Sequence, residues 1–268
     1  MAKNIFVEGV QGSGKTTLLR NLSKKHPEYH VYYEGDLSPV ELAWCSYMGK
    51  KEFEKILAEY TYVKEEILKY TKQEGECMIT AYTRVLAEKR EFYERMEAFE
   101  IYNGRVPFER FHELIMERYR RFAERFAKGE EGVGNLFECS FFQNSLESMM
   151  LYYQMQDEEI VRFYKEAFES LKAADVQMLY LESEDIRGNV LQIKKERTDQ
   201  NGKELWYPLM LAYLNESPYG KAHGYQGLED MIGHFERRQA LEKRMIKEVL
   251  GDACKVLKAK KYCEKDIA

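Results

Sequence analysis

Short apolar runs alternate with segments of helical periodicity over most of the chain. Runs at residues 5–7, 29–33, 135–138, 176–181 and 254–257 are rich in aliphatic, β-branched or aromatic residues. They predict five strands. Since helical segments separate most of these runs, we expect an α/β fold with a parallel, doubly wound sheet.

Amphipathic or charged patterns predict the helices between these strands. Pro27 ends the first helix, and Gly251 ends the last. Ser38 and Pro39 suit the start of a further helix. The longer predicted helices are residues 16–25, 143–154, 157–173, 185–197 and 229–250.

One long segment, about residues 46–130, interrupts this alternation. It is dense in charge, helical in period and too long for an ordinary crossover between neighbouring strands. No strand is predicted within it. We therefore expect one domain over residues 1–268, with a core of about 1–45 and 131–268 and an inserted helical cap over the active site.

Composition excludes several classes of protein. The chain has 268 residues, of which 44% are hydrophobic, and its net charge of −5 gives no electrostatic reason to expect nucleic-acid binding. No apolar run approaches the ~20 residues of a membrane span. The absence of a signal-peptide pattern and of paired cysteine motifs favours a cytoplasmic protein. A homodimer is compatible with the sequence.

The most specific motif follows the first predicted strand. Residues 9–16 read Gly-Val-Gln-Gly-Ser-Gly-Lys-Thr and match the phosphate-binding P-loop pattern, with a strand before it and a helix after it. Glycines let backbone N–H groups surround an anion, Lys15 reaches the β- and γ-phosphates, and Thr16 is a ligand of Mg²⁺. The predicted ligands are ATP and Mg²⁺, and the predicted nucleotide-binding residues are Gly9, Gln11, Gly12, Ser13, Gly14, Lys15, Thr16 and Thr17.

The motif also narrows the fold to a three-layer P-loop fold with a five-stranded parallel sheet. The sequence Phe-Val-Glu-Gly at 6–9, followed by Gly-Ser-Gly-Lys-Thr-Thr at 12–17, resembles the opening of the deoxynucleoside kinases and thymidylate kinases. The resemblance covers residues 1–45 and 133–260, while the cap matches neither family.

The resemblance implies roles for residues after the second strand. Deoxynucleoside kinases place a Glu there, followed by a Trp, and that Glu takes the proton of the acceptor hydroxyl. Glu34 is therefore the first candidate for the base and Asp36 the second. Pro-Val-Glu at 39–41, with Trp44 after it, is similar to a motif of these enzymes with one extra residue.

After the third strand these families carry a carboxylate followed by Arg. Here Glu138 fits the carboxylate beside Mg²⁺, but Cys139 stands in place of the Arg. A basic lid follows the fourth strand in the families. Arg187, Lys194 and Arg197 lie at that place, and one helix face would present all three. They are candidates to stabilise charge on the transferring phosphoryl group.

The acceptor site is less defined. The missing Arg and the acids Glu34 and Asp36 favour a neutral, nucleoside-like hydroxyl acceptor, although Arg84 and Arg105 would reverse this preference if they point inward. Tyr82 and Arg84 are the predicted acceptor contacts in the cap, and Trp44 would line the same pocket. The basic cluster that contains Arg237 and Arg238 is predicted to form a solvated face.

Three functions follow from these patterns. The first is a kinase that transfers the γ-phosphate of ATP to a hydroxyl of a small, nucleoside-like molecule. The second is a nucleotide monophosphate kinase of the thymidylate kinase type. The third is an ATP-binding module that hydrolyses slowly, if at all, and signals to a protein partner through its cap.

Overall fold

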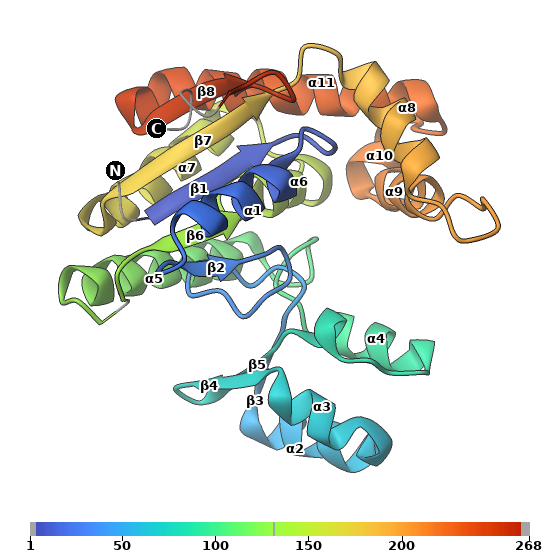
Figure 1. Ribbon diagram of the computed structural model, residues 1–268. Helices are drawn as coiled ribbons and strands as arrows, with labels where there is room; N and C mark the ends of the chain where they lie inside the picture. Colours follow the sequence, from blue (N-terminus) through green and yellow to red (C-terminus); the bar gives the residue numbers. More distant parts are fainter. Residues whose placement is uncertain (1–3, 131, 264–268) are drawn as a thin grey trace.

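A five-stranded sheet lies at the centre of the computed structural model, which describes residues 4–130 and 132–263 (Figure 1). Its strands are β1 (Asn4–Gly9), β2 (His30–Tyr32), β6 (Asn135–Glu138), β7 (Val176–Glu182) and β8 (Cys254–Lys258). They lie in the order β2-β6-β1-β7-β8, and all neighbouring pairs are parallel. The predicted α/β class and parallel sheet are confirmed. Residues 1–3, 131 and 264–268, which the predicted core includes, lie outside the described residues.

Helices cover both faces of this sheet and complete three layers. Ile5 and Val7 of β1 pack with Leu18 and Leu22 of α1, whereas Phe6 between them faces the opposite layer. This alternation is what a strand buried on both faces requires. The helices around the sheet are α1 (Lys15–Lys25), α5 (Phe108–Ala127), α6 (Gln143–Glu147), α7 (Asp157–Leu171), α8 (Ile186–Glu196), α9 (Trp206–Glu216), α10 (Pro218–His223) and α11 (Leu228–Met245).

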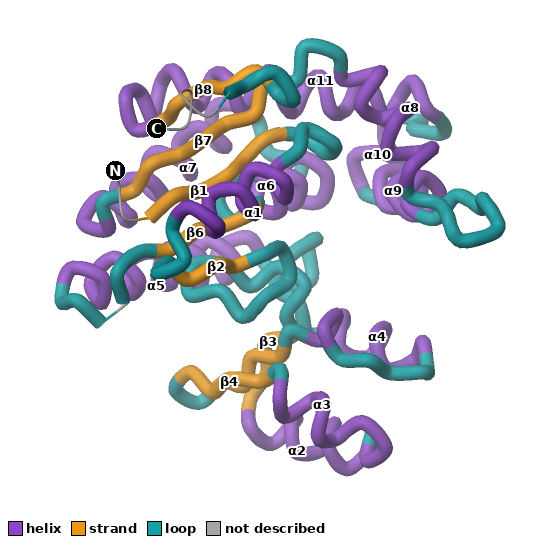
Figure 2. Tube along the Cα trace, in the orientation of Figure 1, coloured by secondary structure: helices purple, strands orange, loops and turns teal. Residues whose placement is uncertain are grey.

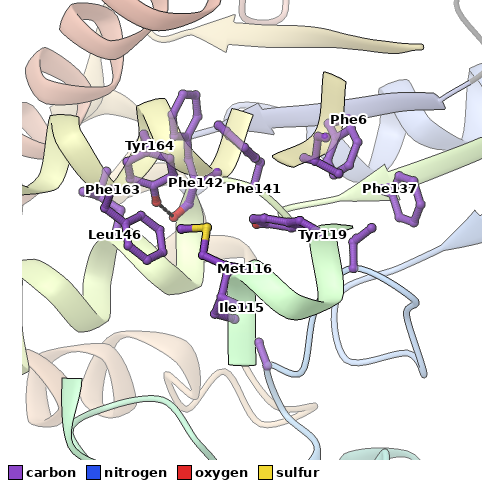
Figure 3. Close-up of a cluster of buried hydrophobic side chains, with 14 of the residues drawn as sticks. Phe6, Ile115, Met116, Tyr119, Phe137, Phe141, Phe142, Leu146, Phe163 and Tyr164 are labelled. Carbon is purple, nitrogen blue, oxygen red and sulfur yellow. Dashed lines mark hydrogen bonds between the residues drawn. The ribbon is translucent and has the colours of Figure 1, made fainter. Parts of the chain in front are cut away.

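The layer opposite α1 holds a core rich in aromatic side chains (Figure 3). Phe6 stacks on Phe137 with ring centroids 4.6 Å apart. The hydroxyl of the fully buried Tyr164 donates a 3.0 Å hydrogen bond to the Phe142 carbonyl. This core fixes the start of α6 beneath the carboxyl ends of β1 and β6.

Two helices continue as π-helical segments, and the chain also forms short 3₁₀ segments. The π-helical segments Ser148–Tyr152 and Ile246–Leu250 continue α6 and α11, and the short 3₁₀ segments are Thr61–Val63, Tyr82–Arg84, Lys172–Ala174 and Gly251–Ala253. The predicted helix at 143–154 is therefore α6 with its π-helical continuation.

The insertion after β2 contains a second, small sheet that the sequence did not predict. Strands β3 (Ser46–Gly49), β4 (Thr71–Glu74) and β5 (Cys77–Thr80) pair antiparallel in the order β3-β5-β4 (Figure 2). The prediction of no strand here was wrong because each strand has four residues and β4 carries mostly polar side chains. Helices α2 (Lys50–Glu59), α3 (Lys64–Lys69) and α4 (Arg90–Glu97) surround a separate core that includes Phe53, Ile56 and Phe92.

Helix α5 lies within the predicted cap boundaries but packs elsewhere. Its buried residues Phe111, Ile115 and Tyr119 belong to the aromatic core beneath the main sheet, together with Phe163 and Tyr164 of α7. The part of the insertion with its own core thus ends near α4. Figure 1 shows this part apart from the five-stranded sheet.

The expected helix at Ser38 and Pro39 is absent from the described residues. The segment forms a loop in which the Ser38 amide donates to the Asp36 carbonyl at 2.8 Å and the Val40 amide donates to Ser38 Oγ at 3.3 Å. Val40 and Leu42 are fully buried, and they anchor this loop to the core. Burial of Val40 and Leu42 holds this segment as a loop, although Ser38 and Pro39 are typical of the start of a helix.

None of the helices in the described ranges combines the length and apolarity needed to cross a bilayer.

Candidate functional site

The loop at residues 9–16 follows the central strand. Gly9, Gly12 and Gly14 have φ angles of 139°, 76° and 98°, which side chains other than glycine rarely adopt. A Cβ on Gly12 would lie 2.5 Å from Cδ1 of Ile193, and one on Gly9 would lie 2.6 Å from the Leu181 carbonyl. The glycines thus permit both the turn and its close packing. Because α1 begins directly after this loop, its free N–H groups can bind an anion.

Lys15 and Thr16 present complementary chemistry at the start of α1. Lys15 is 7% exposed, and its Nζ donates to the carbonyls of Gly9 at 2.7 Å and Val10 at 3.0 Å. The Thr16 hydroxyl donates to Oε1 of Glu138. The two residues meet because β6 lies beside β1 and ends at the same edge of the sheet.

A hydroxyl and a carboxylate in contact fit a Mg²⁺ ion that keeps several water or phosphate ligands. No group of three or more His, Cys, Asp and Glu residues within 4–130 and 132–263 could hold a metal ion. Thr16 and Glu138 would therefore supply only part of a coordination shell.

Glu34 lies next to this pair, as the sequence predicted for a catalytic base. Its Oε1 accepts hydrogen bonds from Trp44 Nε1 at 3.0 Å and from Gln143 Nε2 at 2.7 Å. Its backbone amide lies 3.4 Å from Oε2 of Glu138 and donates to it. The carboxylate is thus oriented by two neutral donors on different segments, a loop and α6.

Asp36 and Arg84 hold the loop after β2. Asp36 Oδ2 accepts from the Tyr33 amide at 2.8 Å, and its Oδ1 pairs with Arg84 at 2.9 Å. Arg84 also donates to the Glu34 carbonyl at 3.1 Å. Neither side chain borders the cavity that Glu34 lines, so the predicted direct contact of Asp36 and Arg84 with a ligand there is not supported.

A cavity of about 730 Å³ connects these groups. It extends from Lys15 and Thr16 past Glu34 and Glu138 to Glu100 of the insertion. Such a volume suits a small ligand or two ligands placed end to end. Trp44 borders it, as predicted, but Tyr82 does not. Tyr82 is buried behind Glu100, to which its hydroxyl donates at 2.7 Å.

The three basic lid candidates separate in the structure. Arg197, directly after α8, borders the cavity. Arg187 is exposed and forms a bidentate pair with Glu229, and Lys194 lies 3.5 Å from Glu204. They do not form the single face that the spacing predicted, because the helix ends before Arg197. Helices α8 and α9 lie beyond the carboxyl ends of β1 and β7 (Figure 1).

The last long helix, α11, carries a buried arginine next to the 9–16 loop that the sequence did not predict. Arg238 is fully buried, not solvated as predicted. Its Nη1 donates to Gln11 Oε1 at 2.9 Å and to Glu147 Oε1 at 2.8 Å, and its Nε donates to Glu242 at 2.8 Å. It therefore joins the 9–16 loop to α6 and α11. Its helical spacing from the apolar Met231 and Met245 was the available signal.

Two buried carboxyl groups have strongly shifted pKa values near the loop. Burial would raise the pKa of Glu147, but the charges and hydrogen bonds of His234 and Arg238 lower it to about 2. Burial raises the pKa of Glu8 to about 7, although the Phe141 amide donates to it at 2.7 Å. Glu147 is thus a stable anion, whereas Glu8 titrates near neutral pH.

Further cavity residues had no motif to identify them. Glu100 follows α4 in the insertion, and Gln143 and Asn144 begin α6. Gln143 and Asn144 directly follow the apolar Phe141 and Phe142, but polar residues at a helix start are common and identify no site, and Glu100 had no signal of its own. A scan against models of protein families and a search of curated proteins found no match to the chain.

Proposed function

We propose that the protein is an ATP- and Mg²⁺-dependent phosphotransferase that moves the γ-phosphoryl group to a hydroxyl of a small, nucleoside-like acceptor. The observation that carries this proposal is the single cavity bordered by Lys15, Thr16, Glu138 and Glu34. Phosphoryl transfer needs a phosphate cradle, a metal ligand and a base in one water-restricted space.

Each group has a distinct role in this reaction. Glu34 accepts the proton of the acceptor hydroxyl as its oxygen forms a bond to the γ-phosphorus and the bond to the β-phosphate oxygen breaks. ADP is the leaving group. Lys15 and Arg197 stabilise negative charge on the phosphoryl oxygens. Mg²⁺ would neutralise charge between the β- and γ-phosphates, with Thr16 and Glu138 beside it.

The thymidylate-type alternative is less well supported. An acceptor that already carries a phosphate needs cations at the acceptor side of the cavity. Arg84 pairs with Asp36, and Arg105 pairs with Glu97 and lies 3.9 Å from Glu100. Neither Arg borders the cavity. Both arginines are exposed residues that already pair with carboxylates outside the cavity, which favours a hydroxyl acceptor without a phosphate.

The proposed location of the reaction is the cytoplasm, where ATP is available. Cys45, Cys77, Cys139 and Cys254 carry free thiols, which suits a reducing compartment.

An acceptor screen with γ-labelled ATP tests the proposal. Nucleosides, nucleoside monophosphates, sugars and amino sugars are each incubated with the protein, ATP and Mg²⁺, and labelled product is separated from ATP. We expect label in a hydroxyl compound and ADP formation that depends on that compound. Label only in monophosphates would favour the thymidylate-type kinase. ADP formation that no acceptor accelerates would favour the ATP-binding module.

A further inference from the structure

The far end of the cavity has a marked imbalance between hydrogen-bond acceptors and donors. We define this acceptor end by six lining residues that do not belong to the 9–16 loop: Glu34, Trp44, Thr83, Glu100, Gln143 and Asn144. They come from the loop after β2, the insertion and α6. None of the described residues that border this end is a Lys or an Arg.

The cations of the cavity lie at its other end. Lys15 belongs to the 9–16 loop, Arg197 follows α8, and Lys260 follows β8. Lys260 is held there, because its Nζ donates to Asn189 and Gln192 at 2.9 Å each. The three cations thus lie on the side predicted for the nucleotide phosphates, where Glu138, Glu147 and Glu196 also border the cavity, whereas the acceptor end has carboxylates and no cation.

Two carboxylates at the acceptor end have oxygen atoms available to a ligand. Glu34 uses Oε1 for Trp44 and Gln143, while its Oε2 accepts no hydrogen bond from the described chain. Glu100 uses Oε1 for Tyr82, and its Oε2 has Arg105 only at 3.9 Å. Glu100 is 4% exposed, and this burial raises its pKa to about 7, so a cation beside Oε2 would favour the charged form of this carboxyl near neutral pH.

The amides beside them also present oxygen atoms. Gln143 is 6% exposed; its nitrogen donates to Glu34, and its carbonyl oxygen has no partner among the residues described. Asn144 donates to Glu41 at 3.0 Å in the same way. Since an ionised carboxylate only accepts hydrogen bonds, the Gln143 nitrogen must face Glu34. The Gln143 oxygen therefore remains as a further acceptor for a ligand, whereas burial raises the pKa of Glu41, so the orientation of the Asn144 amide is not fixed in this way.

A ligand that satisfies this site must be rich in donors and must not be anionic. An ammonium group has three donors and no acceptor, and it neutralises a shielded carboxylate. We propose that the acceptor is a hydroxyl compound with a protonated amine, whose ammonium group binds between Glu100 and Gln143 while its hydroxyl faces Glu34. This inference rests on the proposed phosphotransferase function.

Matched pairs of compounds test the charge of the acceptor. The pairs are glucosamine and N-acetylglucosamine, 3′-amino-3′-deoxythymidine and thymidine, and kanamycin with its fully N-acetylated form. Binding to the wild-type protein is measured by calorimetry with a non-hydrolysable ATP analogue and Mg²⁺, and transfer is measured with labelled ATP. We expect at least one amine to bind about tenfold more tightly than its neutral partner, as one charged hydrogen bond would allow.

The substitution Glu100→Gln tests the position of the amine. It keeps an oxygen for the Tyr82 hydroxyl and removes the charge. We expect KM for the preferred amine to rise about tenfold with kcat little changed, and the preference over the neutral partner to disappear. Glu97→Gln is the matched control, because Glu97 pairs with Arg105 but does not border the cavity. It should keep the preference.

The outcomes separate this inference from the proposed function. Preferred binding or transfer of neutral hydroxyl compounds would overturn the inference and leave the phosphotransferase proposal standing. Transfer to monophosphates alone would overturn both the inference and the proposed hydroxyl acceptor. Preferred binding of an amine that is never phosphorylated would support the site and contradict the proposed function. Equal effects of Glu100→Gln and Glu97→Gln would overturn the assignment of Glu100.

Discussion

Nη1 of Arg238 donates a 2.9 Å hydrogen bond to Oε1 of Gln11, which ties the last long helix to the 9–16 loop across 227 residues of sequence. The same guanidinium pairs with Glu147 and Glu242, and none of these three ionic side chains is more than 5% exposed. Removal of one member of such a buried ion cluster is strongly destabilising, because the remaining charges stay buried without a counter-ion.

We therefore expect Arg238→Met to destabilise the protein by about 3–5 kcal/mol, since Glu147 and Glu242 would lose their shared cation. Urea unfolding followed by circular dichroism measures this change. Lys243→Met on the same helix is the control, because its pair with Glu182 is exposed and should contribute less than about 1 kcal/mol. Equal stability of the two variants would contradict the role given to Arg238.

Glu8 should make stability depend on pH. Its folded pKa of about 7 lies above the ordinary value of 4.5, so its contribution is fully present below pH 4.5 and is lost as pH rises through 7. Oε2 of this buried carboxyl has no hydrogen-bond partner in the described chain. Glu8→Gln should stabilise the protein by about 3 kcal/mol at pH 8 and hardly at pH 4.

Denaturant unfolding of wild type and Glu8→Gln at several pH values measures this difference. Glu54→Gln, at an exposed position of α2, is the control and should follow the wild type at each pH. A stability difference between wild type and Glu8→Gln that stays constant from pH 4 to pH 8 would show that Glu8 is not titrating in this range.

Glu138→Gln should weaken the use of Mg²⁺. The substitution removes the charge next to Thr16, and we expect the Mg²⁺ concentration for half-maximal activity to rise at least about tenfold. A Mg²⁺ titration of phosphoryl transfer measures it. Glu182→Gln is a matched control at the end of β7, on the other side of β1, since Glu182 pairs with Lys243 and does not border the cavity. A similar Mg²⁺ requirement in both variants would exclude a metal role for Glu138.

Arg197 and Arg187 should differ in their effect on kcat. Arg197 borders the cavity, whereas Arg187 is exposed and paired with Glu229. Loss of a donor to the transferring group lowers kcat about 100-fold, so Arg197→Ala should show that loss. Arg187→Ala should stay within about twofold of wild type. Steady-state kinetics measures kcat for both variants. A larger loss of kcat in Arg187→Ala than in Arg197→Ala would contradict the role given to Arg197.

The sequence predicted the main sheet well, for reasons that particular strands illustrate. β1 and β7 contain apolar runs, residues 5–7 and 178–181, because both faces of these strands are buried, and Glu138 marks the carboxyl end of β6. The four-residue strands β3, β4 and β5 were not predicted, because they form through antiparallel pairing with one another and their composition gives little strand signal.

Only those residues of the candidate site that belong to recognisable motifs could be predicted from the sequence. Lys15, Thr16, Glu34 and Glu138 border one cavity, as their strand-end positions indicated. Glu100 could not be found in this way, because it reaches the cavity through the folding of the insertion. Arg238 was misassigned because charge was given more weight than its helical spacing from buried residues.

We propose Glu34 as the base for phosphoryl transfer in this cavity. The most direct test of this role is transfer of label from γ-labelled ATP to the best acceptor, measured for wild type and Glu34→Gln together with ATP affinity. We predict that Glu34→Gln lowers transfer at least about 100-fold, as loss of a general base does, while ATP affinity changes less than about threefold. Unchanged transfer by Glu34→Gln, or equal ADP formation without an acceptor, would contradict the account.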